Sequence, residues 1–190
     1  MNRGSPGVQA YDGLWPGMDR IPGGADTNRG KGIAMAVRIQ KVLYTAQALV
    51  EGGRGGHGRT SDGRLEVSLS VPKEMSGDGG PGTNPEQLFA VGYAACFQSA
   101  LMGVARGHNL DASGSQITSR VDIGPTGHGG FGLAVSLDLH APNLTAAQAA
   151  DLMTRAHERC PYSVATRGNI EVTLTVDGVP VAQAADTAVG

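Results

Sequence analysis

The clearest pattern in the chain is a strict alternation of apolar and polar side chains over residues 64–71 (RLEVSLSV). A period of two predicts a strand with one buried face, which Pro72 ends. The preceding segment 41–51 (KVLYTAQALVE) is also apolar and strand-forming, and Asp62-Gly63 is a strong turn signal between the two. We therefore expect residues 41–51 and 64–71 to pair as a hairpin.

A different pattern covers residues 86–110 (EQLFAVGYAACFQSALMGVARGHNL), where apolar side chains occur on nearly every side of a helical wheel. Such a segment predicts a helix that is buried on most sides. Gly92 is a point where this helix could kink.

Shorter signals follow towards the C-terminus. Strands are predicted at 116–123, 131–140 and 169–176. Between the last two strands, Thr145 and Gln148 form a capping-box pattern that predicts the start of a helix. Its apolar residues share one helical face, so we expect this face to point inward: Ala149, Leu152, Met153, Ala156 and Cys160.

Clustered strands, two main helices and no regular strand–helix alternation predict an α+β fold. The apolar helix needs more cover than one small sheet supplies, which favours a dimer. Residues 1–38 are rich in glycine and proline and are expected to be a disordered extension. Residues 39–178 form the predicted domain, and the Ala-rich residues 179–190 are expected to be a frayed tail.

Composition narrows the possible functions. The net charge of −2 argues against a nucleic-acid-binding protein. No apolar run reaches the length of a membrane span, and the N-terminus has no apolar signal-peptide region. We therefore expect a cytoplasmic protein in a reducing compartment, where permanent disulfides are rare.

The two cysteines, Cys96 and Cys160, are the strongest candidates for chemistry. From the residues alone they could form a structural disulfide, be inert core residues or act as a redox couple. A reactive thiol needs a nearby positive charge, because the thiolate is the nucleophile. Arg54, in the sequence GGRGG, is a candidate, and Glu86 could orient it. Alternatively, Arg54 lies in a solvated loop and Glu86 only suits the helix dipole.

Other kinds of site have little support. No HExxH, CxxC or helical i, i+4 histidine pair occurs, so no metal site is expected. No glycine-rich phosphate-binding motif follows a predicted strand.

Four segments carry a resemblance to a known family: 42–46 (VLYTA), 83–97 (TNPEQLFAVGYAACF), 129–133 (GGFGL) and 160–172 (CPYSVATRGNIEV). They resemble the OsmC/Ohr family and, within it, the organic hydroperoxide resistance branch. The resemblance implies an intertwined α+β homodimer, with antiparallel sheets wrapped around central helices and active sites at the subunit interface. It also implies a thiol peroxidase without haem, flavin or metal, reduced by dihydrolipoamide or a lipoylated protein.

The same resemblance implies a role for individual residues. Cys96 matches the peroxidatic cysteine and Cys160 the resolving cysteine, while Arg54 and Glu86 match the pair that activates the thiolate. The implied substrates are alkyl and fatty-acid hydroperoxides. Apolar candidates for binding their tails are Leu88, Phe89, Phe97, Met102 and Phe131.

One geometric constraint accompanies these roles. Glu86 and Cys96 are about 15 Å apart along a straight helix, at about 1.5 Å per residue. We therefore expect either a bend near Gly92 or a site shared between two subunits. Two other functions stay open: a non-catalytic dimer that binds lipid or acts in stress responses, and a structural protein with a permanent disulfide.

Overall fold

The computed structural model describes residues 37–127 and 129–182. The chain divides into two compact units, Met1–Val67 and Ser68–Gly190. The predicted extension falls outside the described residues except for Val37 and Arg38, which are exposed.

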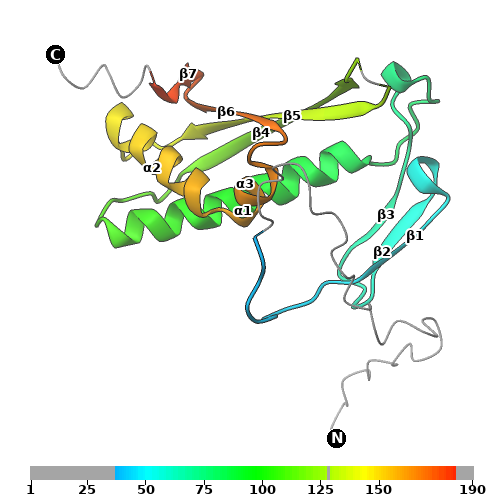
Figure 1. Cartoon of the computed structure of the whole chain (residues 1–190), viewed down its shortest axis with the longest axis horizontal. Helices are drawn as coiled ribbons and strands as arrows, with labels where there is room; N and C mark the ends of the chain where they lie inside the picture. The colour runs from blue at the N-terminus through cyan, green and yellow to red at the C-terminus, as the bar shows by residue number, and fades with distance from the viewer. Residues whose placement is uncertain (1–36, 128, 183–190) are drawn as a thin grey trace, which may run out of the picture. The chain divides into compact units, whose positions relative to one another are not determined.

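A small sheet with the strand order β1-β2-β3 lies in the first unit, except for Ser68, the last residue of β3, which belongs to the second unit (Figure 1). β1 (Ala48–Glu51) pairs antiparallel with β2 (His57–Thr60), and β3 (Glu66–Ser68) lies beside β2. The short 3-10 turn η1 (Gly53–Gly55) connects β1 to β2. This sheet is the scaffold on which η1 and its Arg54 are held.

The hairpin prediction is only partly correct. The turn at Asp62-Gly63 is confirmed: Gly63 has a φ of 67°, and the Asp62 carboxylate accepts hydrogen bonds from Thr60 Oγ1 and the Arg64 backbone N–H. However, this turn joins β2 to β3. The predicted strand 41–51 is too long, because only its last four residues are β1, and its partner is β2.

The second unit contains the larger sheet, ordered β4-β5-β6-β7, and three helices (Figure 1). Its elements in chain order are the 3-10 turn η2 (Lys73–Met75), α1 (Pro85–Gly107), β4 (Gln116–Pro125), β5 (Phe131–His140), α2 (Ala146–Arg159), α3 (Pro161–Thr166), β6 (Glu171–Val176) and β7 (Val179–Pro180). The helices lie along one face of the sheet, and α1 packs against β4 and α2. The predicted α+β class is confirmed.

The prediction of antiparallel sheets needs one correction. The pairs β4/β5 and β6/β7 are antiparallel, but β5 and β6 are parallel, with Val135 opposite Val172. Parallel neighbours need a long crossover. Here the crossover contains α2 and α3, so the parallel pairing is what places these two helices against α1.

Most of the predicted elements of this unit are present. The long apolar helix is α1, and the capping box of Thr145 and Gln148 begins α2. Strands predicted at 116–123, 131–140 and 169–176 correspond to β4, β5 and β6. The tail predicted to fray from residue 179 is wrong in its first two residues, because Val179 and Pro180 form β7 on β6.

The core of the second unit lies between the sheet and the helices. One face of α1 contributes Tyr93, Phe97, Leu101 and Val104, and alternate residues of β5 meet them. The expectation that α1 is buried on most sides fails for the single chain, because Val91 is 72% and Met102 42% exposed. The outer face of α1 is therefore an apolar surface that the described residues of the second unit leave uncovered.

α1 is also the one helix in the described part of the chain that has the length and composition to cross a membrane. Core helices pass the same test, so the observation is weak evidence for a span. The packing of Tyr93, Phe97 and Leu101 in the core identifies α1 as a core helix of this unit.

Candidate functional site

Cys96 lies near the middle of α1 and is partly buried. Tyr93 precedes it by three residues and Phe97 follows it, and both of these side chains are fully buried. Cys96 thus stands at the border between the buried face of α1 and its exposed face.

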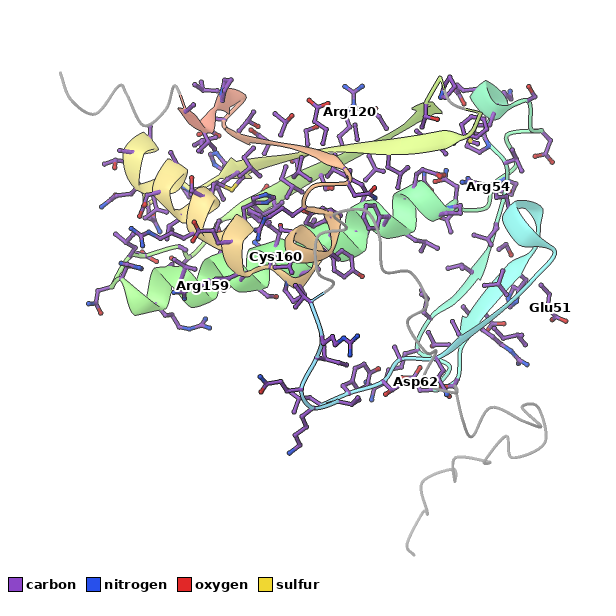
Figure 2. All side chains as sticks on the ribbon, viewed as in Figure 1. Glu51, Arg54, Asp62, Arg120, Arg159 and Cys160 are labelled. Carbon is purple, nitrogen blue, oxygen red and sulfur yellow. The ribbon has the colours of Figure 1, made fainter. Side chains whose placement is uncertain are left out.

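Cys160 lies at the junction of α2 and α3 and is fully buried (Figure 2). Its backbone N–H still donates to the Ala156 carbonyl, at 2.8 Å, which closes the last turn of α2. Its own backbone is extended, with φ −64° and ψ 125°, as expected for a residue before proline. Pro161 then begins α3 at the position that proline prefers. The chain turns at Cys160, and the predicted inward orientation of this side chain is confirmed.

The two sulfurs are close together, because Sγ of Cys160 lies 3.5 Å from Sγ of Cys96. Both cysteines are free thiols in this structure. A disulfide bond is about 2.05 Å long, so the sulfurs need to approach by about 1.5 Å to bond. The predicted proximity of the two sulfurs is thus confirmed, although the cysteines lie 64 positions apart in the chain.

Burial raises the pKa of the Cys96 thiol above its ordinary value, and the neighbouring Cys160 raises it further. A hydrogen bond from the Tyr162 backbone acts in the opposite direction. The net shift is upward, so at neutral pH the unreactive thiol form predominates in this environment. A positive charge near Cys96 would lower this pKa and favour the thiolate.

Three aromatic rings pack together where α1 meets α3: Phe89 and Tyr93 from α1 and Tyr162 from α3. Tyr162 stacks on Phe89 with ring centroids 5.8 Å apart, and Tyr93 lies 5.6 Å from Tyr162. Gly92 faces the same ring: a Cβ added there would lie 3.2 Å from the Tyr162 hydroxyl. Glycine at this position thus permits close approach of Tyr162 to α1.

α1 continues without a break from Pro85 to Gly107, so the structure shows no interruption of the helix at Gly92. Glu86 lies in the first turn of α1, two residues after the Asn84 N-cap. It lines a pocket of about 350 Å³ together with Gln87 and Ser119. Since the helix separates Glu86 from Cys96 by several turns, a site shared between two subunits stays a prediction.

Arg54 lies in η1 of the first unit, between glycines that fix the shape of the turn (Figure 2). Gly52 and Gly53 have positive φ angles of 74° and 58°. A Cβ at Gly56 would lie 1.8 Å from the Glu51 carbonyl, so only glycine fits there. The approach of Arg54 to Cys96 stays a prediction.

The five predicted substrate-binding residues occupy different environments. Phe89 is part of the aromatic group where α1 meets α3, whereas Phe97 is fully buried in the core. Leu88 is half-buried in α1, Met102 lies on the exposed face of α1, and Phe131, at the start of β5, is 70% exposed. Of the five, Phe89 is the one in the described part of the second unit whose ring stacks on Tyr162, two residues after Cys160.

Sequence reasoning missed the hydroxyl groups that lie beneath the sulfurs. Tyr93 donates a hydrogen bond to Ser163 Oγ at 2.9 Å and lies 3.2 Å from Thr166 Oγ1. All three side chains are buried. A tyrosine inside an otherwise apolar helix was the available signal, since a buried tyrosine hydroxyl usually has a hydrogen-bond partner. Within residues 37–127 and 129–182, no three His, Cys, Asp or Glu side chains are grouped as metal ligands would be.

The fold and the site together describe an α+β protein with two adjacent thiols at the contact of its central helix with a crossover segment. A family model described as OsmC-like protein matches residues 77–175. An organic hydroperoxide resistance protein of Xanthomonas axonopodis is 51% identical over 138 residues, which cover 72% of this chain and 96% of that protein. The chain belongs to the OsmC-like family.

Solved structures of related proteins support the same family assignment. A putative organic hydroperoxide resistance protein of Vibrio cholerae, with captopril bound in one of its active sites, superposes with a TM-score of 0.71 at 48% identity. The superposition covers 75% of this chain and 98% of the Vibrio cholerae chain. The organic hydroperoxide resistance protein OhrB of Bacillus subtilis gives a TM-score of 0.66 at 43% identity, covering 71% of this chain and 99% of its own. The homologues thus associate this chain with organic hydroperoxide resistance.

Proposed function

We propose that this protein is a thiol-dependent peroxidase that reduces organic hydroperoxides to alcohols. The observation that carries the proposal is the 3.5 Å separation of the two free thiols, one partly exposed and one fully buried. The names of its relatives, organic hydroperoxide resistance proteins, support the choice of substrate class.

In the first step, the Cys96 thiolate attacks the terminal oxygen of the hydroperoxide. The O–O bond breaks, an alcohol leaves after its oxygen takes up a proton, and Cys96 becomes a sulfenic acid. Sγ of Cys160 then attacks Sγ of Cys96. The S–O bond breaks, a disulfide forms, and the hydroxyl leaves as water with the proton of the Cys160 thiol.

Arg54 is the proposed source of the positive charge, and Glu86 its orienting carboxylate. The guanidinium counteracts the upward pKa shift that burial gives Cys96, and it stabilises negative charge on the departing oxygen. Such electrostatic stabilisation is worth about 3 kcal/mol. The apolar groups near the site favour alkyl and fatty-acid hydroperoxides over hydrogen peroxide.

A second copy of the chain is part of the proposal. The exposed apolar face of α1, with Val91 and Met102, is suited to burial in a homodimer. A dimer also offers a route for Glu86 of one subunit to serve the thiols of the other. The proposed external reductant is dihydrolipoamide, free or on a lipoylated protein, with no bound cofactor. The proposed location is the cytoplasm.

The test is a dihydrolipoamide-coupled assay that compares t-butyl hydroperoxide with hydrogen peroxide, in the wild type and Cys96→Ser. We expect rapid turnover of t-butyl hydroperoxide, slower turnover of hydrogen peroxide, and neither reaction above background in the variant. Equal rates for the two proteins would rule out the peroxidase and favour a non-catalytic lipid-binding or stress-related dimer.

A further inference from the structure

Three buried hydroxyls join α1 to α3 one turn away from the sulfurs. Tyr93 donates to Ser163 Oγ at 2.9 Å and lies 3.2 Å from Thr166 Oγ1. Thr166 Oγ1 also donates to the Tyr162 carbonyl at 2.9 Å, within α3. Tyr93 and Ser163 are fully buried and Thr166 is 5% exposed, so this network is almost completely shielded from bulk solvent.

The network and the sulfur pair connect the same two helical turns. Tyr93 precedes Cys96 by three residues in α1, and Ser163 follows Cys160 by three residues in α3. Residues three apart lie on one face of a helix. The hydrogen bond from Tyr93 to Ser163 and the contact between Cys96 and Cys160 therefore lie side by side.

α3 depends on such contacts for its position. It has only six residues, and the side chain of Cys160, its N-cap, makes no capping hydrogen bond to the first turn. A helix of this length is not stable by itself. The hydroxyl network, together with the stacking of Tyr162 on Phe89, holds its first turn on α1.

We propose that Tyr93 is a positioning residue for the second step of the reaction, in which Cys160 resolves the Cys96 sulfenic acid. This inference rests on the function proposed above. The sulfurs need to move from 3.5 Å to about 2.05 Å for the disulfide to form. Tyr93 keeps α3, and with it Cys160, within reach of Cys96 while the sulfenic acid exists.

The resolving step competes with a second oxidation. The sulfenate sulfur of Cys96 can attack the terminal oxygen of a second hydroperoxide molecule; the O–O bond breaks, another alcohol leaves, and the product is a sulfinic acid that Cys160 no longer resolves. The ratio of disulfide to sulfinic acid at a fixed hydroperoxide concentration therefore measures how fast Cys160 reaches Cys96. A change in global stability alone leaves this ratio unchanged in folded protein.

The test uses Tyr93→Phe, which removes the hydroxyl and keeps the ring. The reduced full-length protein is treated with excess t-butyl hydroperoxide, and disulfide and sulfinic acid are quantified by mass spectrometry. We expect the ratio to fall about fivefold, the size of effect that loss of one hydrogen bond produces. The rate at which the Cys96 thiol is first consumed is expected to stay at the wild-type value. Tyr44→Phe, at an exposed tyrosine of the first unit, is the matched control.

Ser163→Ala removes the other end of the hydrogen bond and keeps the test valid if Tyr93→Phe does not fold. It should lower the ratio to a similar extent, and the double variant should add little. A wild-type ratio in either folded single variant would overturn the inference. Failure of the proposed function can be distinguished from failure of this inference. If the protein is not a peroxidase, the wild type forms no disulfide with one equivalent of hydroperoxide.

Discussion

The cysteine pair and the arginine turn are built in opposite ways. Cys160 is fully buried, and the two sulfurs are held by packed helices and a buried hydrogen-bond network. η1, which carries Arg54, contains no buried residue, and glycines define its shape. The core of the second unit thus fixes the distance between the thiols, whereas Arg54, the proposed activating charge, lies in a surface turn. This difference separates two properties that mutations can test independently: resolution of the oxidised sulfur and activation of the reduced one.

The largest effect on hydroperoxide turnover is expected from replacing the buried Cys160. Cys160→Ser should allow one round of hydroperoxide reduction and then stop, because no second thiol protects the Cys96 sulfenic acid. Single-turnover consumption of hydroperoxide, followed by mass spectrometry of Cys96, is the measurement. Continued turnover with dihydrolipoamide and no sulfinic acid would show that Cys160 is dispensable.

The next effect concerns the arginine turn. Arg54→Ala should slow oxidation of Cys96 about a hundredfold at neutral pH, since the lost stabilisation is about 3 kcal/mol. Burial already raises the pKa of Cys96, and without the guanidinium the thiolate forms only at higher pH. The rate of thiol loss in the variant should therefore increase as the pH rises but stay below that of the wild type, because the departing oxygen is no longer stabilised. Arg64→Ala, at an exposed arginine near the same sheet, is the control.

A smaller effect should follow from a change on the exposed apolar face of α1, which contains Val91 and Met102. Val91→Lys places a charge on this apolar face and should shift the protein towards monomers in analytical ultracentrifugation. Hydroperoxide reduction should fall in parallel if the site needs both subunits. Val179→Lys, at an exposed valine in β7, is the control. A monomeric wild-type protein with full activity would contradict the shared site.

The smallest effect concerns the packing of Tyr162 on α1. Replacing a mid-helix glycine by alanine normally stabilises a helix by about 0.5–1 kcal/mol. In Gly92→Ala most of this gain should be lost, because the new Cβ lies 3.2 Å from the Tyr162 hydroxyl. Gly103→Ala, whose Cβ would have only the end of Arg106 nearby at 3.9 Å, should show the full gain. Thermal denaturation measures both, and adding Tyr162→Phe should recover the gain at Gly92.

Sequence patterns were sufficient for the elements whose burial follows a clear period. α1, β4, β5 and the capping box of Thr145 were all predictable, because apolar spacing and end signals are local properties. β2 (HGRT) was not predicted, since it has no apolar alternation and forms by pairing with β1. The parallel pairing of β5 and β6 is a property of the whole chain, which strand periodicity does not contain.

Some features of the candidate site were likewise predictable from the sequence, and others were not. The resemblance to a family, carried by four sequence segments, pointed to the contact between Cys96 and Cys160, which the structure confirms at 3.5 Å. The supporting hydroxyls were not predictable, because nothing local indicates that Tyr93 meets residues 70 positions further along the chain. Roles for Arg54 and Glu86 stay predictions, since they depend on how parts of the protein come together.

The 64-residue separation of the two cysteines has a thermodynamic consequence. A bond between them would close a large loop that includes β4, β5 and α2, and so restrict the unfolded chain. Loop-closure entropy for a ring of this size amounts to about 4 kcal/mol in favour of the folded state. The oxidised protein should therefore be the more heat-resistant form, and reduction by a dithiol would return it to a looser one. The melting temperature of a sample would then show whether its cysteines are oxidised or reduced.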